Sequence, residues 1–346
     1  MKRVMHLLPS NRFSGAENVI CQIMSLFSQS DDVEMVYCSP EGEIRQALNE
    51  RKLPFLPLAR FTRTEIKSAI ESFKPDVIHA HDMKAGVVAA AVCGKTKLIC
   101  HIHNNSFKSR AVNIKSILFC YAAAKAKHIF WVSQPAYEGY AFHKCFQKKS
   151  SILYNIVDAD KVVEKMQLDA NTYSYDIVYL GRLTFPKNPQ RLLDVFEKVV
   201  ATRPDATLAI IGTGDLEQEV RELVDAKGLQ RNICLLGFQS NPYKMLHDAK
   251  LMLMTSRWEG LPMCVLESMT LGVPVVSTPT DGVREVVRSG ENGFLGQTDE
   301  ALVEAIIDLL DNEEKRALMG KMAKHHIMKV MDKQIYKTTL LKAYEE

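Results

Sequence analysis

The strongest constraint on the fold is a regular alternation of short apolar runs with segments of helical periodicity. In the first half of the chain, the runs predicted as strands that precede such helical segments include residues 3–9, 33–40, 75–82 and 97–104. After an irregular stretch over 154–174, the alternation resumes with predicted strands at residues 175–183, 206–215, 232–238, 250–256 and 273–279. Repeated strand–helix units build parallel sheets covered by helices on both faces. The sequence therefore predicts an α/β protein of two doubly wound domains.

Length and composition agree with this architecture. The 346 residues suffice for two domains of ordinary size, and 47% apolar with 25% charged residues is typical of soluble globular proteins. No apolar run approaches the roughly 20 residues of a membrane-spanning helix, and the first segment turns polar too early for a signal peptide. We therefore expect a cytoplasmic protein. The eight cysteines form no C-x-x-C pair, so neither disulfides nor a zinc site is expected.

Positive charge is concentrated in one region. Residues 83–150 contain eleven Lys or Arg and one acidic residue, Glu138, a net charge of +10. Such a block can meet nucleic acid, an anionic membrane or a phosphate-bearing substrate, or it can be a solvated face. Nucleic acid is the poorest partner because no recognised binding motif accompanies the charge. We expect an anionic membrane surface, with Ile114 and Leu118 facing the core. The cations expected to contribute are Lys108, Arg110 and Lys115.

The segment "SRWEGLPMCVLES" places Glu259 in a turn and Glu267 in a predicted helix. We expect this helix over 262–271, with Pro262 at its first position and Gly272 ending it. The helix is apolar around most of its circumference and is expected to be buried. A buried, unpartnered carboxylate costs several kcal/mol, so we expect Glu267 to face a ligand such as a ribose diol. A salt-bridged structural Glu267, and a Glu259 that only stabilises a helix N-terminus, are the alternatives.

Two further loops follow predicted strands. In "YLGRLTFPKNPQRLL", Arg182 and Lys187 stand between a strand and a helix, where two cations can hold a diphosphate or can simply be solvated. In "IIGTGDLE", Gly212 and Gly214 lack the third glycine of a dinucleotide fingerprint, so a plain strand-to-helix turn is favoured. No Asp-x-Asp pair stands at a strand end, and no metal is expected.

Several of these segments together resemble one family. The E-x7-E segment with "SMTLGVPVVSTPTDGVREVV" after it resembles the family 4 retaining glycosyltransferases of the GT-B fold, and "GRLTFPKN", "NRFSGAENVI", "PDVIHAHD" and "YNIVD" resemble further parts of that family. The resemblance runs from about residue 4 to 326. It implies two Rossmann-like parallel-sheet domains that face a central cleft. The N-terminal acceptor-binding domain would span 1–157, with a crossover helix at about 328–346, and the donor-binding domain would span 172–327.

The resemblance also implies roles for single residues. Glu267 should bind the ribose hydroxyls and Glu259 the hydroxyls of the donor sugar. Arg182 and Lys187 should neutralise the diphosphate. Gly15 should let backbone N–H groups approach the leaving phosphate, and His103 should contact the donor sugar. Ser14 replaces the first of the two glycines common in this N-terminal loop. We expect His101 and His103 to alternate between the two faces of a strand, so that only one of them is functional. The same question of which histidine is functional arises for His79 and His81 on the neighbouring strand.

The predicted function is retaining transfer of a sugar from a nucleotide-diphosphate donor, UDP-linked, to a saccharide or lipid-diphosphate-linked acceptor. The expected process is synthesis of a bacterial surface polysaccharide such as a capsule or exopolysaccharide. No cofactor is expected, and the protein should associate peripherally with the inner face of the cell membrane. The alternatives are a GT-B nucleotide-sugar epimerase, which has no use for the E-x7-E pair, and an inactive nucleotide-sugar-binding module, against which the intact set of Glu259, Glu267, Arg182 and Lys187 argues.

Overall fold

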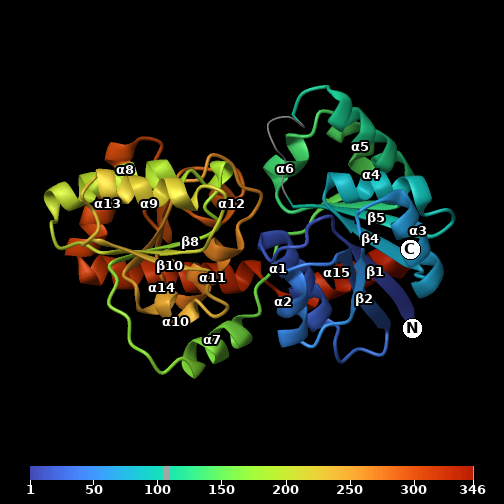
Figure 1. The fold of residues 1–346 in the computed structure, drawn as a ribbon, viewed down its shortest axis with the longest axis horizontal. Coiled ribbons are helices and arrows are strands. Elements are labelled where there is room, and N and C mark those ends of the chain that lie inside the picture. The colour runs from blue at the N-terminus through green and yellow to red at the C-terminus, as the bar shows by residue number, and fades with distance from the viewer. Residues whose placement is uncertain (104–109, 346) are drawn as a thin grey trace. The chain divides into compact units, whose positions relative to one another are not determined.

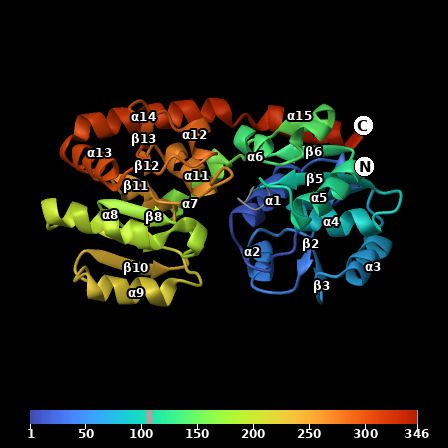
Figure 2. The same cartoon turned by 90° about the horizontal axis from the view of Figure 1, so that it is seen from above.

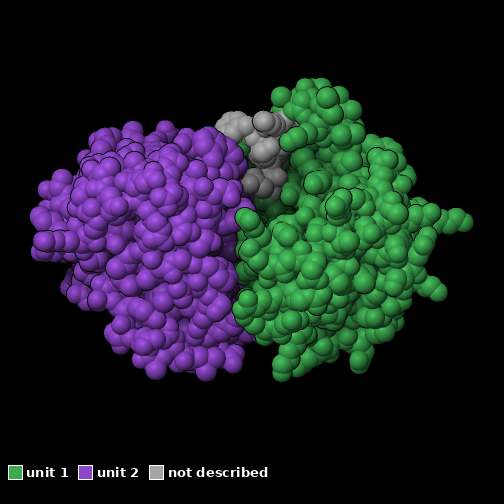
Figure 3. Space-filling model, in the orientation of Figure 1, with its two compact units in different colours: residues 1–156, 332–346 green, residues 157–331 purple. Residues whose placement is uncertain are grey.

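A computed structural model describes residues 1–103 and 110–345. The chain divides into two compact units (Figure 3): unit 1 contains residues 1–156 and 332–346, and unit 2 contains residues 157–331. Each unit is built on one parallel sheet with helices on both faces (Figure 1), which confirms the prediction of two doubly wound domains. The central cleft stays a prediction. No helix among the described residues is long and apolar enough to cross a membrane.

Unit 1 has seven parallel strands in the order β3-β2-β1-β4-β5-β6-β7. The strands are β1 (Lys2–Leu7), β2 (Val33–Pro40), β3 (Phe55–Leu58), β4 (Val77–His81), β5 (Lys97–Ile102), β6 (His128–Trp131) and β7 (Ser150–Ile152). The helices are α1 (Gly15–Leu26), α2 (Ile44–Glu50), α3 (Arg63–Phe73), α4 (Met83–Val92), α5 (Ile114–Lys125), α6 (Gln134–Glu138), the 3-10 helix η2 (His143–Lys149) and α15 (Lys333–Glu345). The strand order reverses between β1 and β4, and open α/β sheets bind ligands at such a switch point.

The two faces of the unit 1 sheet differ in chemistry. One face is apolar and packs with α3, α4 and α5, through side chains such as Leu7, Ile78 and Cys100. The opposite face contains buried histidines and packs against α15, whose Tyr344 hydroxyl lies 2.9 Å from His79 Nδ1. The crossover helix at the end of the chain thus completes the core of unit 1.

Helix α5 exposes the side chains that the sequence analysis assigned to the core. Ile114 and Leu118 are 77% and 49% exposed, so that prediction was wrong. The helix instead turns a face of small side chains and one phenylalanine inward, against α4: Ser116, Phe119, Ala122 and Ala123. Small side chains let two helices approach closely, which explains why this face is the buried one. Of the cations predicted to meet a membrane, Arg110 and Lys115 are exposed, and Lys108 lies outside the described residues.

Unit 2 has six parallel strands in the order β10-β9-β8-β11-β12-β13, with a switch point between β8 and β11. The strands are β8 (Ile177–Leu180), β9 (Leu208–Ile211), β10 (Ile233–Gly237), β11 (Leu251–Met254), β12 (Val275–Ser277) and β13 (Gly293–Leu295). The helices are α7 (Ala159–Leu168), η3 (Phe185–Lys187), α8 (Pro189–Thr202), α9 (Glu217–Ala226), α10 (Tyr243–Asp248), α11 (Met263–Leu271), α12 (Val283–Val286), α13 (Asp299–Asp311) and α14 (Glu313–Val330). Helices α8, α9 and α13 form one layer, and α10, α11 and α14 lie in the other (Figures 1 and 2).

Helix α11 is buried along its whole length, as its apolar circumference predicts. Pro262 is not its first helical residue: with ψ at 128° it is extended and stands at the N-cap position. The helix ends at Gly272, whose φ of 78° is left-handed and therefore favours glycine, as predicted. Glu267 is thus a carboxylate on a helix with no exposed face.

Candidate functional site

In unit 2, the loops after β8 and β11 lie on either side of the switch point and bring two predicted residues into contact. Lys187 Nζ lies 2.7 Å from Glu259 Oε1, and the two side chains are 17% and 11% exposed. Burial alone lowers the pKa of Lys187, but Glu259 outweighs it and holds that pKa above its ordinary value. Lys187 is therefore a fixed, mostly buried cation with one anionic partner.

Arg257, which the sequence analysis did not single out, fixes the loop that contains Lys187. Its backbone N–H donates to Pro186 O (2.8 Å), and its guanidinium donates to Asn188 Oδ1 (2.8 Å) while stacking on the Phe185 ring at 4.4 Å. Asn188 has a φ of 53°, a left-handed conformation that asparagine tolerates better than most residues. The sequence signal for this loop conformation is Asn188, an asparagine that stands directly before Pro189, the first residue of α8.

Arg182 is an exposed cation beside this pair. It forms no ion pair with any residue in the described parts of the chain, and its charge acts on Lys187. The backbone around it is closely packed, since a Cβ at Gly212 would lie 2.0 Å from Gly181 O. Gly212, with a φ of 135°, thus lets the loops after β8 and β9 touch, which supports a structural role for "IIGTGD". Arg182 is left available to bind an anion.

Glu267 is 6% exposed and accepts a hydrogen bond from the Tyr243 hydroxyl at 3.3 Å. One turn earlier on α11, burial raises the pKa of the Cys264 thiol to about 12, and the charges of Lys187, Glu259 and Glu267 all act on this thiol. The two carboxylates of the E-x7-E segment therefore lie on the same part of unit 2 as Lys187. Tyr243, on α10, is a second residue that sequence reasoning missed.

In unit 1, Gly15 is the first residue of α1 and follows the loop after β1, at the switch point. A Cβ at Gly15 would meet nothing within 4 Å, so the space in front of this backbone is open. The Ser14 hydroxyl donates to Glu17 Oε2 at 2.5 Å, and Glu17 is 2% exposed. An anion bound at this helix N-terminus would meet the Glu17 carboxylate, and the phosphate role of Gly15 stays a prediction.

Asp82 is a third residue missed from the sequence. It follows β4 directly and has a φ of 84° with a ψ of 155°, a conformation that residues other than glycine rarely adopt. Burial raises the pKa of Asp82, and the charge of Glu17 adds to this effect. Strain of this kind persists mainly at functional sites. The signal was the acidic residue that immediately follows a strand in "PDVIHAHD".

Five histidines form a continuous layer on one face of the unit 1 sheet. Their ring centroids are separated from their neighbours by 4.3 to 5.4 Å, and the rings belong to His6, His79, His81, His101 and His103. The expectation that His101 and His103 alternate was wrong, since residues i and i+2 of a strand point to the same face. His101 and His103 are both buried. Burial also lowers the pKa of two rings of the layer, those of His6 and His103, to about 3. The layer is uncharged at neutral pH.

Two triplets in this layer could offer ligands to a metal ion. In His6, His79 and His81, and again in His81, His101 and His103, ring nitrogens lie within 4.8 Å of one another. The hydrogen-bonded nitrogens, 2.8 to 2.9 Å apart, are closer than the roughly 3.3 Å that separates two ligands of a tetrahedral ion with bonds near 2.0 Å. The rings are therefore arranged as hydrogen-bond partners, and the prediction that no metal is needed stays untested.

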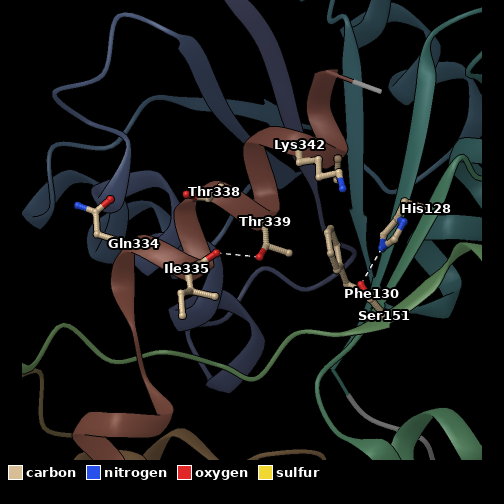
Figure 4. A pocket seen from close by; sticks show the side chains of 9 residues that line it. His128, Phe130, Ser151, Gln334, Ile335, Thr338, Thr339 and Lys342 are labelled. Carbon is tan, nitrogen blue, oxygen red and sulfur yellow. Dashed lines mark hydrogen bonds between the residues drawn. The ribbon is translucent and has the colours of Figure 1, made fainter.

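A groove of about 560 Å³ lies elsewhere on unit 1, between α15 and strands β6 and β7 (Figure 4). Lys342 and Thr338 belong to its helical wall, and His128, which lies 2.8 Å from Ser151 Oγ, belongs to its strand wall. None of the residues predicted from the sequence lines this groove.

Comparison with known proteins places the chain in a family. The family described as Glycosyltransferase Family 4 matches residues 13–161, and the family described as Glycosyl transferases group 1 matches residues 160–326. The chain belongs to the family 4 glycosyltransferases. Its fold is GT-B: the family 4 chain superimposes on Anabaena HepE, solved in complex with UDP and glucose, with a TM-score of 0.86, 18% identity and 100% coverage of both chains.

Relatives of this family 4 chain occur in bacteria and archaea. It is 31% identical over 264 residues to an uncharacterized glycosyltransferase of Methanocaldococcus jannaschii. The matched region covers 69% of the chain and 65% of that relative, so the chain spans slightly less than two thirds of the relative's length. It is 22% identical over 363 residues to the Escherichia coli UDP-Gal:alpha-D-GlcNAc-diphosphoundecaprenol alpha-1,3-galactosyltransferase, covering 94% of the chain and 92% of that enzyme.

Proposed function

We propose that the chain is a retaining glycosyltransferase that moves a sugar from a UDP-sugar to a saccharide or lipid-linked saccharide acceptor. The observation that supports this most strongly is the Lys187–Glu259 pair, with Arg182 available beside it, at the switch point of unit 2. Breaking a sugar–diphosphate bond leaves negative charge on the diphosphate and positive charge on the sugar. The Lys187 cation can stabilise the negative charge on the diphosphate, and the Glu259 carboxylate beside it can stabilise the positive charge on the sugar.

Each residue of unit 2 has a separate task in this proposal. Arg182 and Lys187 bind the diphosphate and stabilise it as it leaves, without a metal ion. Glu259, already oriented by Lys187, accepts hydrogen bonds from the donor sugar. Glu267 accepts the ribose hydroxyls, with Tyr243 holding one of its oxygens in place. In unit 1, His103 and the backbone at Gly15 contribute contacts to the sugar and the leaving group.

The acceptor class is supported by what related proteins act on. The E. coli relative named above acts on a diphosphoundecaprenol-linked sugar, and a Campylobacter jejuni relative, 29% identical over 180 residues, also acts on a diphospho-undecaprenol-linked saccharide. We infer a lipid-diphosphate-linked acceptor in surface polysaccharide synthesis. Such an acceptor is anchored in a membrane, so the enzyme has to work at the membrane surface.

Helix α5 offers a surface that suits this location. Its exposed apolar side chains recur at i, i+3, i+4 and i+7, the spacing of one helix face: Ile114, Ile117, Leu118 and Tyr121. Lys115 is exposed on the same helix, exposed Arg110 precedes the helix in the sequence, and both belong to the block of net charge +10. Apolar side chains with flanking cations are what an interfacial helix presents to an anionic bilayer. We infer peripheral binding to the inner face of the cell membrane through α5.

Calorimetry with UDP tests the nucleotide site. Wild-type protein should bind UDP, and Glu267→Ala should weaken binding by about tenfold or more, because the ribose loses a charged acceptor. Tyr243→Phe is the control, since it leaves the carboxylate in place and should cost much less. Unchanged UDP affinity in Glu267→Ala would exclude Glu267 from ribose binding.

A further inference from the structure

Three of the five buried imidazoles in unit 1 are hydrogen-bonded in series. His6 Nδ1 lies 2.9 Å from His81 Nε2, and His81 Nδ1 lies 2.8 Å from His103 Nε2. Burial keeps all three rings neutral, because it lowers the pKa of His6 and of His103 to about 3 and that of His81 well below its ordinary value. Each ring therefore has one N–H donor and one nitrogen lone pair.

Such a series has only two possible proton arrangements. His81 uses both nitrogens, so one must donate and the other must accept. If His81 carries its proton on Nε2, it donates to His6 Nδ1 and accepts from His103 Nε2, so all three rings are Nε2–H tautomers. If His81 carries its proton on Nδ1, both hydrogen bonds reverse and all three rings are Nδ1–H tautomers.

The far end of the series decides between the two. His6 Nε2 lies 3.4 Å from the Sδ atom of Met35, a buried residue of β2. A thioether sulfur has no hydrogen and can only accept. When all rings are Nε2–H tautomers, His6 directs its N–H at this sulfur. In the other arrangement, a nitrogen lone pair faces sulfur lone pairs at a buried position, which is unfavourable.

We propose that Met35 fixes His6, His81 and His103 as Nε2–H tautomers, so that His103 presents the lone pair of Nδ1 as a hydrogen-bond acceptor for its ligand. This Nδ1 atom has no partner among the residues that the structure describes, and it stands directly after β5, at the carboxyl edge of the sheet. His6 and His81 are then positioning residues. The group that His103 recognises must supply a hydrogen, as a sugar hydroxyl does and a phosphate oxygen does not.

The tautomers can be measured directly on the full-length protein. In protein labelled with ¹⁵N-histidine, long-range ¹H–¹⁵N correlation spectra at pH 7 distinguish Nε2–H from Nδ1–H rings, with assignments from single replacements. We expect His6, His81 and His103 all to be Nε2–H. The control is His79→Phe, which keeps an aromatic ring in the layer but lies outside the series, and should leave the three tautomers unchanged. Nδ1–H tautomers in the wild type would overturn the proposal.

Met35→Leu tests the origin of this preference. Leucine fills a similar volume but offers no acceptor, so a measurable fraction of Nδ1–H tautomer should appear on all three rings together. If every ring stays Nε2–H in Met35→Leu, then Met35 does not set the direction of the series.

Only the nature of the ligand depends on the proposed function. With UDP-glucose as the probe, replacing the sugar hydroxyls one at a time by fluorine removes a donor while keeping a similar size. One replacement should weaken binding to the wild type about fivefold or more and have little effect on His103→Ala. Equal losses in both proteins for every fluorinated sugar would remove His103 from sugar recognition. Failure of the protein to bind UDP-glucose would count against the donor assignment and leave the tautomer result intact.

Discussion

At the scale of single residues, Asp82 offers the sharpest separation of stability from function. Its backbone strain costs on the order of 1–3 kcal/mol. Its carboxyl interacts with the backbone N–H of Met83, the first residue of α4, but caps no later turn of that helix. Asp82→Gly should therefore raise the melting temperature of the protein, because glycine adopts a φ of 84° without strain. If the carboxylate serves the substrate, the same change should lower the rate of sugar transfer.

Asp82→Ala provides the control, because it also removes the carboxylate but keeps a Cβ in the strained conformation. Calorimetric melting should rank Asp82→Gly above Asp82→Ala. If the two variants melt together, the backbone at this position stores no strain that a glycine can release.

Residue types and spacing predicted much of the candidate site in unit 2. Lys187 and Glu259 do meet, and Glu267 does lie on a buried helix. Arg257 and Tyr243 could not be found in this way, since each acts through a partner distant in the sequence, on Asn188 and on Glu267. The histidine layer was missed because His101 and His103, both visible in "HIHN", were assigned to opposite faces of a strand. Residues two positions apart on a strand in fact point to the same face.

At the scale of elements, α5 supports a prediction about membranes. Replacing Ile117 and Leu118 by serine removes two exposed apolar side chains from its outer face. Each contributes on the order of 1 kcal/mol when buried in a bilayer interface, so binding to anionic vesicles should fall about tenfold or more. UDP binding should be retained, because both residues lie in unit 1.

In the matched control, serine replaces Leu318 and Met322, two exposed apolar residues that lie four positions apart on α14 of unit 2. In liposome flotation at low salt, this variant should float as the wild type does. Wild-type protein that stays in the soluble fraction would show that the charge of residues 83–150 is only a solvated face.

Periodicity could not predict which face of α5 is buried, because the helix has two faces free of charge. Ile114 and Leu118 belong to the more hydrophobic face, yet Phe119 and Ala122 belong to the one that packs against α4. Close packing with an alanine-rich neighbour decides the orientation, and this information lies in a different segment of the chain.

At the scale of the whole molecule, the sequence predicted two doubly wound units because strands and helices alternate twice. Strand order cannot be predicted from periodicity. The reversals between β1 and β4 and between β8 and β11 emerge only from the paired sheets, and they determine where Asp82 and Lys187 lie. The return of the chain to unit 1 through α15 is fixed by a contact between Tyr344 and His79, 265 residues apart.

The most direct test of the account is the configuration of the first product. A panel of α-linked UDP-sugars should be incubated with the protein and EDTA, and the released or transferred sugar followed by ¹H NMR. We expect one donor to give the α anomer first, with the metal removed, and Lys187→Ala to slow the reaction about 100-fold or more. A first product with the β configuration, turnover that requires an added divalent metal, or no turnover of any UDP-sugar would contradict it.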